Sequence, residues 1–237
     1  MTVYESNMYP ETKTWNPFVG CRFGCVYCDP SFKRMLRRVA GRIGCCLCYT
    51  YDPHYHYSRL FRIPSAPNVF VAGTGDISFC SQKFVKRIFK AIEDHKPRKP
   101  KTYFFQSKNP VIFNLYLDWF KANKDKVVLL TTLESNMVHG GISKAPNPIN
   151  RFQAFYELDY PRKVVTIEPV LDFDINEFSY WMSLLHDQGS LEYVWFGFDS
   201  KNCGLPEPPT GKAQNFVDGL KALGIEVRGK SVRDVIV

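Results

Sequence analysis

Three cysteines in the segment Cys21-Arg-Phe-Gly-Cys25-Val-Tyr-Cys28 have a spacing that suits metal binding. Iron–sulfur clusters need thiolate ligands, and three thiolates within eight residues can wrap one face of a cube-shaped cluster. Gly24 would let the backbone curl tightly around it. A structural zinc ion would need a fourth ligand close by, and a redox pair of Cys25 and Cys28 would leave Cys21 without a role. The spacing therefore favours a [4Fe–4S] cluster with one open iron, with zinc and thiol redox chemistry as alternatives.

A second group of soft ligands follows at Cys45, Cys46, Cys48, His54 and His56. Thiolates and imidazoles this close in sequence can hold zinc or a second cluster. The alternatives are a buried thiol patch beside one hydrogen-bonded histidine, and an active-site position for His56. Six of the eight cysteines lie between residues 21 and 48, and no secretory signal is visible. We therefore interpret the cysteines as metal ligands or catalytic groups and not as a disulfide framework.

The elements that must position these residues alternate between strand and helix patterns. Strands are predicted at 14–19, 68–72, 102–106, 127–131, 164–167 and 193–197, and helices at 31–43, 81–95, 111–122, 150–158, 175–186 and 210–223. The alternation predicts an α/β fold with parallel strands and helical crossovers. Six such units favour a partial (βα)6 barrel in a single domain over residues 1–237. Residues 42–67 do not fit the pattern, so we expect a Cys/His-rich insertion there.

Polar residues gather where the predicted strands end, and in such folds the carboxyl ends of the strands bind ligands. They are Gly73, Thr74, Gly75 and Asp76 after the second strand, Ser107 and Lys108 after the third, Thr132 and Glu134 at the fourth, Glu168 after the fifth and Cys203 after the sixth. Carboxylates buried there cost free energy unless they are paired or used. Each residue alone could be a helix cap, a turn, an ion pair or a free loop thiol. The polar ends of the third to sixth strands, four in register on one face, indicate a ligand site.

The charge balance favours an anionic partner. Lysine and arginine number 31 against 23 aspartates and glutamates, which gives a net charge of +8. Arg34, Arg37 and Arg38 lie just after the first cysteine loop, and tyrosines follow at 49, 51, 55 and 57. Basic and aromatic side chains together suit phosphates and unstacked bases, although a solvated helix face gives the same pattern. No apolar run is long enough to span a membrane, so we expect no membrane partner and a cytoplasmic location, in the host if a phage encodes the chain.

The first cysteine motif resembles that of the radical S-adenosylmethionine superfamily, C-x3-C-x-aromatic-C, with Tyr27 at the aromatic position. The resemblance implies a radical-SAM-type barrel in which Cys21, Cys25 and Cys28 hold a [4Fe–4S] cluster. The open iron would bind the amino and carboxylate groups of S-adenosylmethionine, with Tyr27 near the adenine. Further cofactor contacts implied by the resemblance are the turn Gly73-Thr74-Gly75-Asp76 at the amino group, Lys108 at the carboxylate, Glu134 at the ribose, and Ser107, Thr132 and Glu168 nearby. Asp76 stands where the family pattern has Glu.

A wider resemblance concerns a phage-associated branch whose reaction is unassigned. The run Trp15-Asn-Pro-x-x-Gly-Cys21 is similar to that branch, as are the Ser107-Lys108, Thr132-x-Glu134 and Ile-Glu168-Pro169 strand ends. The superfamily resemblance implies that an electron donor reduces the cluster and that S-adenosylmethionine is cleaved to a 5′-deoxyadenosyl radical, which abstracts hydrogen from a substrate. Cys203 could return a hydrogen atom. We expect a nucleotide or a modified nucleic-acid base as substrate. The alternative is a non-enzymatic zinc or iron–sulfur module that binds nucleic acid and has no cofactor cavity.

Overall fold

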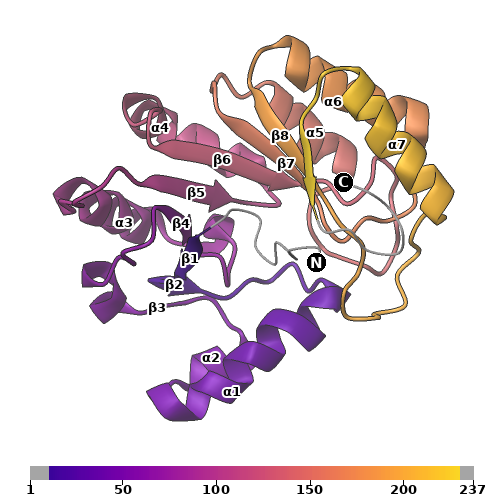
Figure 1. Ribbon diagram of the computed structural model, residues 1–237. Helices are drawn as coiled ribbons and strands as arrows, with labels where there is room; N and C mark the ends of the chain where they lie inside the picture. Colours follow the sequence, from indigo (N-terminus) through magenta and orange to yellow (C-terminus); the bar gives the residue numbers. More distant parts are fainter. Residues whose placement is uncertain (1–10, 230–237) are drawn as a thin grey trace.

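The computed structural model describes residues 11–229, which form a curved parallel sheet covered by helices. The strands are β1 (Thr12–Trp15), β4 (Asn68–Val71), β5 (Thr102–Gln106), β6 (Val127–Thr132), β7 (Lys163–Ile167), β8 (Leu191–Phe196) and β9 (Val227–Gly229). Their order in the sheet is β1-β4-β5-β6-β7-β8-β9, and every neighbouring pair is parallel. The sheet curls into a half-barrel (Figure 1). The predicted partial α/β barrel is confirmed.

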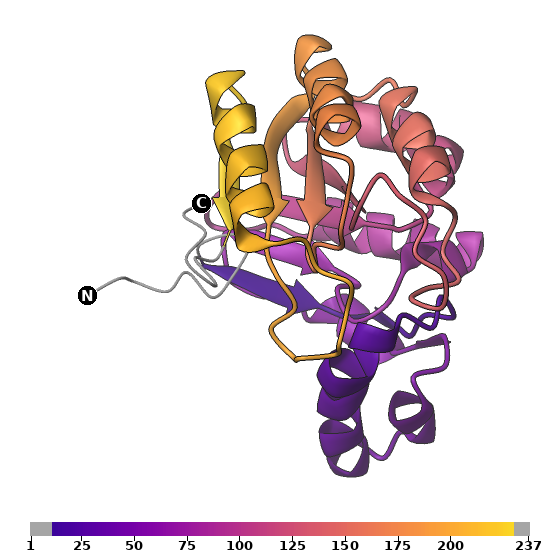
Figure 2. The ribbon, with the colours of Figure 1, turned by 90° about the vertical axis from the view of Figure 1, so that its right-hand side faces the viewer.

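The helices that connect the strands pack against the outer face of the half-barrel (Figures 1 and 2). They are α3 (Gln82–Asp94), α4 (Leu117–Ala122), α5 (Pro148–Tyr156), α6 (Ile175–Asp187) and α7 (Thr210–Ala222). Right-handed crossovers between strands that neighbour each other in chain order place all helices on one side. In α3, Phe84, Ile88 and Ile92 form a buried stripe at a four-residue step. Ser81 caps this helix by accepting a hydrogen bond from the backbone N–H of Phe84.

The inner face of the half-barrel has an apolar layer and, above it, a polar layer. Side chains alternate between the two faces of a strand, so every second residue points inward. The apolar layer consists of Phe104, Val128, Leu130, Val164, Tyr193 and Trp195. Two residues further along their strands, Gln106, Thr132 and Thr166 form hydrogen bonds with one another. This polar layer lies at the carboxyl ends of the strands, where the functional site is expected.

The structure differs from the predicted elements at several places. The helix predicted at 111–122 is a 3-10 helix, Pro110–Tyr116, followed by the short α4. The strand predicted at 14–19 ends at Trp15, and Phe18–Val19 forms a separate strand β2 that pairs antiparallel with β3 (His54–Tyr55). Pro17 lies between the two pieces and has no N–H to donate to a sheet, so the chain leaves β1 there. The edge strand β9 was not predicted, because three residues are too few for a clear alternating pattern.

The segment after the cysteine loop forms a small unit at the lower end of Figure 1. A π-helical turn, Asp29–Lys33, leads into α1 (Arg34–Ile43), which packs on α2 (Cys46–Thr50). The two helices share a small core with β2 that contains Val19, Leu36, Ala40, Cys48 and Tyr51. The predicted insertion therefore packs on the strand that carries the cysteine loop. Within residues 11–229, none of the helices has the length and apolarity to cross a membrane.

Candidate functional site

A cavity of about 520 Å³ opens at the carboxyl ends of the strands. Its lining comes from the cysteine loop, from the ends of β4 to β8 and from the loop that follows β8. The lining residues used below are Cys21, Cys25, Tyr27, Cys28, Tyr51, Gly73, Gly75, Gln106, Lys108, Thr132, Thr166, Glu168, Trp195 and the stretch 198–201. Segments far apart in the sequence thus meet around one space, as expected for the carboxyl edge of a parallel sheet.

The three motif cysteines line this cavity from a single loop. Gly24 has φ = +62°, the left-handed conformation that lets the loop curl between Cys21 and Cys25. The loop after β6 holds it in place, because Val26 donates a backbone hydrogen bond to the Ile142 carbonyl at 3.0 Å and Lys144 donates one to the Phe23 carbonyl at 2.7 Å.

The electrostatics of the thiols differ from one cysteine to the next. Burial raises the pKa of Cys21 to about 12, and the negative charge of Asp76 acts in the same direction. A hydrogen bond between Cys28 and Cys25 lowers the pKa of Cys25 and raises that of Cys28. The Cys25 sulfur also lies 3.1 Å from the Ser143 hydroxyl and 3.4 Å from the Lys108 ammonium nitrogen, and both contacts favour its thiolate.

The donor set fits a cluster better than a single ion. Among the residues that the structure describes, one group of four brings its ligand atoms within 4.8 Å of one another, and it does not include the three motif cysteines. The three motif sulfurs are therefore not all as close together as the ligands of one ion, and in a cluster each thiolate binds a different iron. Three soft donors on one cavity wall are suited to a [4Fe–4S] cluster, and the cavity beside them leaves room for a small ligand.

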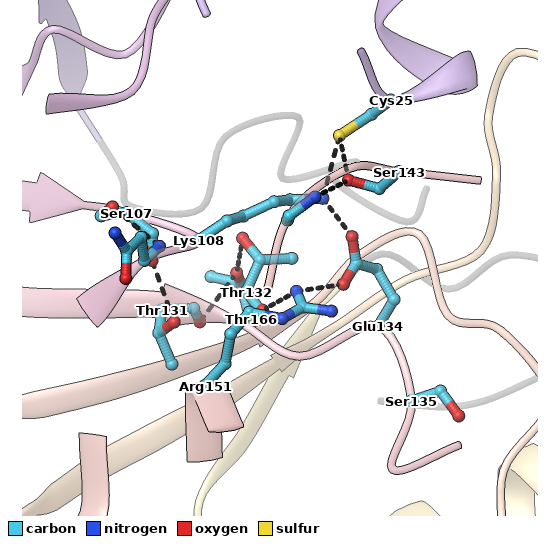
Figure 3. Close-up of polar contacts among 12 residues, drawn as sticks. Cys25, Ser107, Lys108, Thr131, Thr132, Glu134, Ser135, Ser143, Arg151 and Thr166 are labelled. Carbon is cyan, nitrogen blue, oxygen red and sulfur yellow. Dashed lines mark hydrogen bonds and ion pairs between the residues drawn. The ribbon is translucent and has the colours of Figure 1, made fainter. Parts of the chain in front are cut away.

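Glu134 lies between two cations at the edge of the cavity. One carboxylate oxygen contacts the Lys108 ammonium, and the other accepts a hydrogen bond from Arg151 Nη1 at 2.5 Å (Figure 3). The first oxygen also accepts a hydrogen bond from the Tyr27 hydroxyl. Burial alone would raise the pKa of Glu134, but the charges of Lys108 and Arg151 outweigh it and hold the pKa at about 2. Arg151 also donates to the Thr132 carbonyl at 2.6 Å. The network keeps Glu134 anionic and holds the Lys108 ammonium beside Tyr27 and Cys25.

The turn after β4 is pressed against the start of the cysteine loop. Gly20 donates a backbone hydrogen bond to the Thr74 carbonyl at 3.1 Å, and the backbone N–H of Asp76 donates one to the Gly20 carbonyl at 3.2 Å. A Cβ on Gly75 would lie 2.8 Å from the Gly20 carbonyl oxygen, so this close approach requires glycine. Gly73 and Gly75 line the cavity, whereas Thr74 is buried behind them.

Asp76 and Ser107 brace the site from behind and are not among the lining residues of the cavity. The buried Asp76 carboxylate accepts hydrogen bonds from the hydroxyls of Ser78 and Ser107, both at 2.7 Å, and from the backbone N–H of Ser78 at 3.0 Å and of Lys108 at 2.8 Å. Burial raises its pKa in spite of these bonds. The two carboxylate oxygens of Asp76 accept all four of these hydrogen bonds. Four of the predicted cofactor residues are not part of the cavity lining: Thr74, Asp76, Ser107 and Glu134. Cys203, predicted to return a hydrogen atom, also lies outside the lining.

Several residues that shape the site were not predicted. Gln106 donates hydrogen bonds from its amide nitrogen to the hydroxyls of Thr132 at 2.6 Å and Thr166 at 3.0 Å, and these three residues make up the polar layer. Trp195 donates from its indole nitrogen to Glu168 at 2.5 Å. The two-residue period of the strands could have identified Gln106, Thr166 and Trp195 as inward-facing. Arg151 and Ser143 carried no such signal, because they reach Glu134 and Cys25 from a helix and a loop.

Comparisons with known proteins add a likeness of fold. No family model and no curated protein matches this sequence. One solved structure, described as native anSMEcpe with bound AdoMet and Cp18Cys peptide, is similar with a TM-score of 0.47 and 12% identity. The match covers 92% of this chain and 62% of that chain, so this chain spans less than two thirds of its length. A likeness at this level carries no information on activity.

The motif and the sheet are then the two features that classify the molecule. Cys21, Cys25, Tyr27 and Cys28 follow the pattern C-x3-C-x-aromatic-C, and they lie at the carboxyl edge of a parallel half-barrel. This cysteine pattern at the edge of a parallel half-barrel is the arrangement expected from the resemblance to the radical S-adenosylmethionine superfamily.

The other predicted site residues lie on the small unit formed by α1, α2, β2 and β3, here called the α1–α2 unit. Cys45, Cys48, His54 and His56 converge, whereas Cys46 is exposed and outside their group. Arg34, Arg37 and Arg38 are exposed on α1, and Arg37 lies 3.1 Å from the Asp29 carboxylate. These arginines follow directly on Ser31 and Phe32, which line the cavity.

Proposed function

We propose that this protein is a radical S-adenosylmethionine enzyme and that its cofactors bind in the cavity at the carboxyl edge of the half-barrel. The observation that carries the proposal is the placement of Cys21, Cys25 and Cys28 on one wall of a cavity of about 520 Å³, with the Lys108 ammonium 3.4 Å from the Cys25 sulfur. A small ligand in this space would contact the cluster and the ammonium together.

Each residue in this proposal has a task that follows from its position. Cys21, Cys25 and Cys28 would hold the cluster, and Lys108 would attract a carboxylate of the ligand as a point charge. Glu134, held anionic by Arg151, would orient Lys108 and Tyr27 from behind. Gly73 and Gly75 present backbone groups and no side chain, which lets a ligand approach closely. When bound, a cluster reduced by one electron from an external reductant would cleave S-adenosylmethionine to methionine and a 5′-deoxyadenosyl radical, which would take a hydrogen atom from a substrate.

The alternative of a non-enzymatic zinc or iron–sulfur module is less well supported. It predicts a structural task for every cysteine and no space for a cofactor beside them. The motif cysteines instead line a cavity together with the ends of strands β4 to β8. Burying the Glu134 carboxylate between two cations also costs desolvation free energy. A purely structural site would not require such a buried charge network.

For the substrate we propose a nucleotide or a modified nucleic-acid base. The support is the exposed basic face of α1, which begins next to Ser31 and Phe32 at the cavity. A phosphate held by Arg34 or Arg38 would place the attached base or sugar near the cavity mouth. The net charge of +8 favours the same class of partner.

Anaerobic reconstitution tests the proposed chemistry. Wild-type protein should bind about four irons and four sulfides per chain and should release 5′-deoxyadenosine from S-adenosylmethionine when a strong reductant is present. Cys25→Ala should do neither, and Cys46→Ser, which changes an exposed cysteine outside the cavity, should do both. A wild-type protein that binds the cluster but neither binds nor cleaves S-adenosylmethionine would overturn the proposal.

A further inference from the structure

Four side chains of the α1–α2 unit converge on one point outside the cavity. They are Cys45 and Cys48 around α2 and His54 and His56 around β3, and their ligand atoms all lie within 4.8 Å of one another. The Cys48 sulfur is 3.2 Å from Nε2 of both histidines, and the Cys45 sulfur is 3.4 Å from Nε2 of His54. The two Nε2 atoms are 3.0 Å apart. His54 and Cys48 are buried and the other two are half-buried.

The proton on His54 can be placed from its hydrogen bond. Its Nδ1 lies 2.7 Å from the backbone carbonyl oxygen of Asp52. A carbonyl can only accept, so Nδ1 carries the hydrogen and Nε2 of the neutral ring presents a lone pair. That lone pair points at two sulfurs and a second imidazole nitrogen. A histidine that ligates a metal typically donates its other N–H to a backbone carbonyl in this way.

We propose that Cys45, Cys48, His54 and His56 bind one zinc ion. Two sulfurs and two nitrogens form the closed, tetrahedral ligand set of a structural zinc site. With ordinary zinc bond lengths, sulfur and nitrogen ligands stand about 3.6 Å apart and two nitrogens about 3.3 Å apart; the distances here are a few tenths of an ångström shorter. A two-iron cluster would need its two cysteines and two histidines on different metals, whereas here one sulfur contacts both imidazoles.

The proposed ligand set contains four of the five residues of the second group expected from the sequence and leaves out Cys46. Cys46 follows Cys45 directly, but α2 starts at Cys46 and turns its side chain to solvent. Cys48 faces the small core with Val19 and Tyr51, so it is the second cysteine of the site. The proposed ion therefore joins the start of α2, its buried face and the segment around strand β3.

The zinc site would stabilise one wall of the cofactor cavity. His54 pairs in the β2–β3 ladder with Val19, two residues before Cys21. The segment between the ligands carries Tyr51, which lines the cavity, and the Asp52 carbonyl packs on Gly20 so closely that a Cβ there would lie 2.4 Å from it. Fixing residues 45–56 therefore also fixes Gly20 and Tyr51. The site is structural, because all four positions around the ion are taken by protein.

Metal analysis of a cluster-free protein tests the zinc site separately from the proposed enzyme. The variant with Cys21, Cys25 and Cys28 all changed to Ala should contain about one zinc per chain after purification without added metal. Adding Cys48→Ser or His54→Ala should remove nearly all of it, and adding Cys46→Ser should leave it unchanged. Zinc in the triple variant cannot depend on the cluster, so its loss or presence is independent of radical chemistry.

Cobalt substitution covers the case in which a ligand variant fails to fold. Co²⁺ added to the metal-free triple variant should give the strong visible absorption of a tetrahedral site with thiolate ligands, and equimolar Zn²⁺ should displace it. A chelator that removes the metal should lower the melting temperature of the same protein. No zinc and no tetrahedral cobalt spectrum, or full zinc content in a folded Cys48→Ser protein, would overturn the proposal in favour of a hydrogen-bonded thiol and histidine cluster.

Discussion

The carboxylate of Asp76 accepts a hydrogen bond from the backbone N–H of Lys108 at 2.8 Å, although the two residues follow different strands. The Asp76 carboxylate also accepts a hydrogen bond from the Ser107 hydroxyl. Asp76 therefore ties the turn after β4 to the end of β5 and sets where the Lys108 side chain starts. In the structure it is Lys108, and not Asp76, that reaches the cavity.

Removing the Asp76 carboxylate should destabilise the protein and misplace Lys108. Asp76→Ala removes four hydrogen bonds to a buried anion, and we expect the free energy of unfolding to fall by about 3 kcal/mol or more. Asp94→Ala, which removes an exposed carboxylate paired with Lys90, should cost less than about 1 kcal/mol. Chemical denaturation of the metal-free proteins measures both. Equal, small losses would show that the Asp76 bonds contribute little.

Lys108→Met should weaken S-adenosylmethionine binding while the cluster stays intact. A lost charge-assisted hydrogen bond is worth about 1.5–3 kcal/mol, which corresponds to roughly tenfold or more in affinity. Lys90→Met, on the exposed face of α3, is the control and should bind normally. Calorimetry on the reconstituted protein gives the affinities, and the iron absorption checks the cluster. Wild-type affinity in Lys108→Met would remove this residue from the proposed site.

Each of the three motif cysteines should be essential for the cluster. Cys21→Ala, Cys25→Ala and Cys28→Ala should each lose the iron-dependent visible absorption, because three thiolates are the whole protein contribution in the proposed site. Cys80→Ala changes a cysteine in the main core and should keep the absorption. A complete [4Fe–4S] spectrum in all three motif variants would rule the assignment out.

Lys163 makes the stability of the protein depend on pH. Burial lowers the pKa of this lysine from 10.5 to about 8, and its nitrogen contacts the Tyr156 carbonyl at 3.3 Å. Between pH 8 and 10.5 the unfolded chain binds the proton and the folded chain has lost it, so stability should rise with pH across this window, by about 3 kcal/mol in total.

Replacing Lys163 by Met tests this dependence. Lys163→Met keeps most of the apolar stem and has no proton to bind, so its stability should not show the rise from this residue. Unfolding curves of the metal-free proteins at pH 7, 9 and 10.5 compare the two slopes. Parallel curves for wild type and variant would contradict the lowered pKa.

The basic face of α1 should bind nucleic acid in a salt-dependent way. Binding of labelled single-stranded DNA should fall with salt, and Arg34→Ala and Arg38→Ala should each reduce the log–log slope by about 0.7 if each contacts one phosphate. Arg98→Ala, on an exposed loop after α3, is the matched control. Absence of binding at low salt, or binding that ignores Arg34 and Arg38, would direct the search to a small metabolite or a peptide.

The sequence alone determined the features that depend on local spacing. The alternation of strands and helices was predicted and agrees with the structure. Gly24 was expected to let the cysteine loop curl, and its backbone is left-handed there. These features could be predicted because a loop of eight residues and a strand of five follow short-range rules of backbone geometry and side-chain period.

The tertiary structure decided which polar residues face the cavity and which support it from behind. Asp76 and Lys108 looked alike as polar strand ends, yet one is fully hydrogen-bonded inside the fold and the other lines the space. Arg151 meets Glu134, and Ser143 meets Cys25, across separations that no sequence period encodes. Which side chain reaches which partner depends on how loops from different strands pack over one another, and that packing is a property of the whole half-barrel.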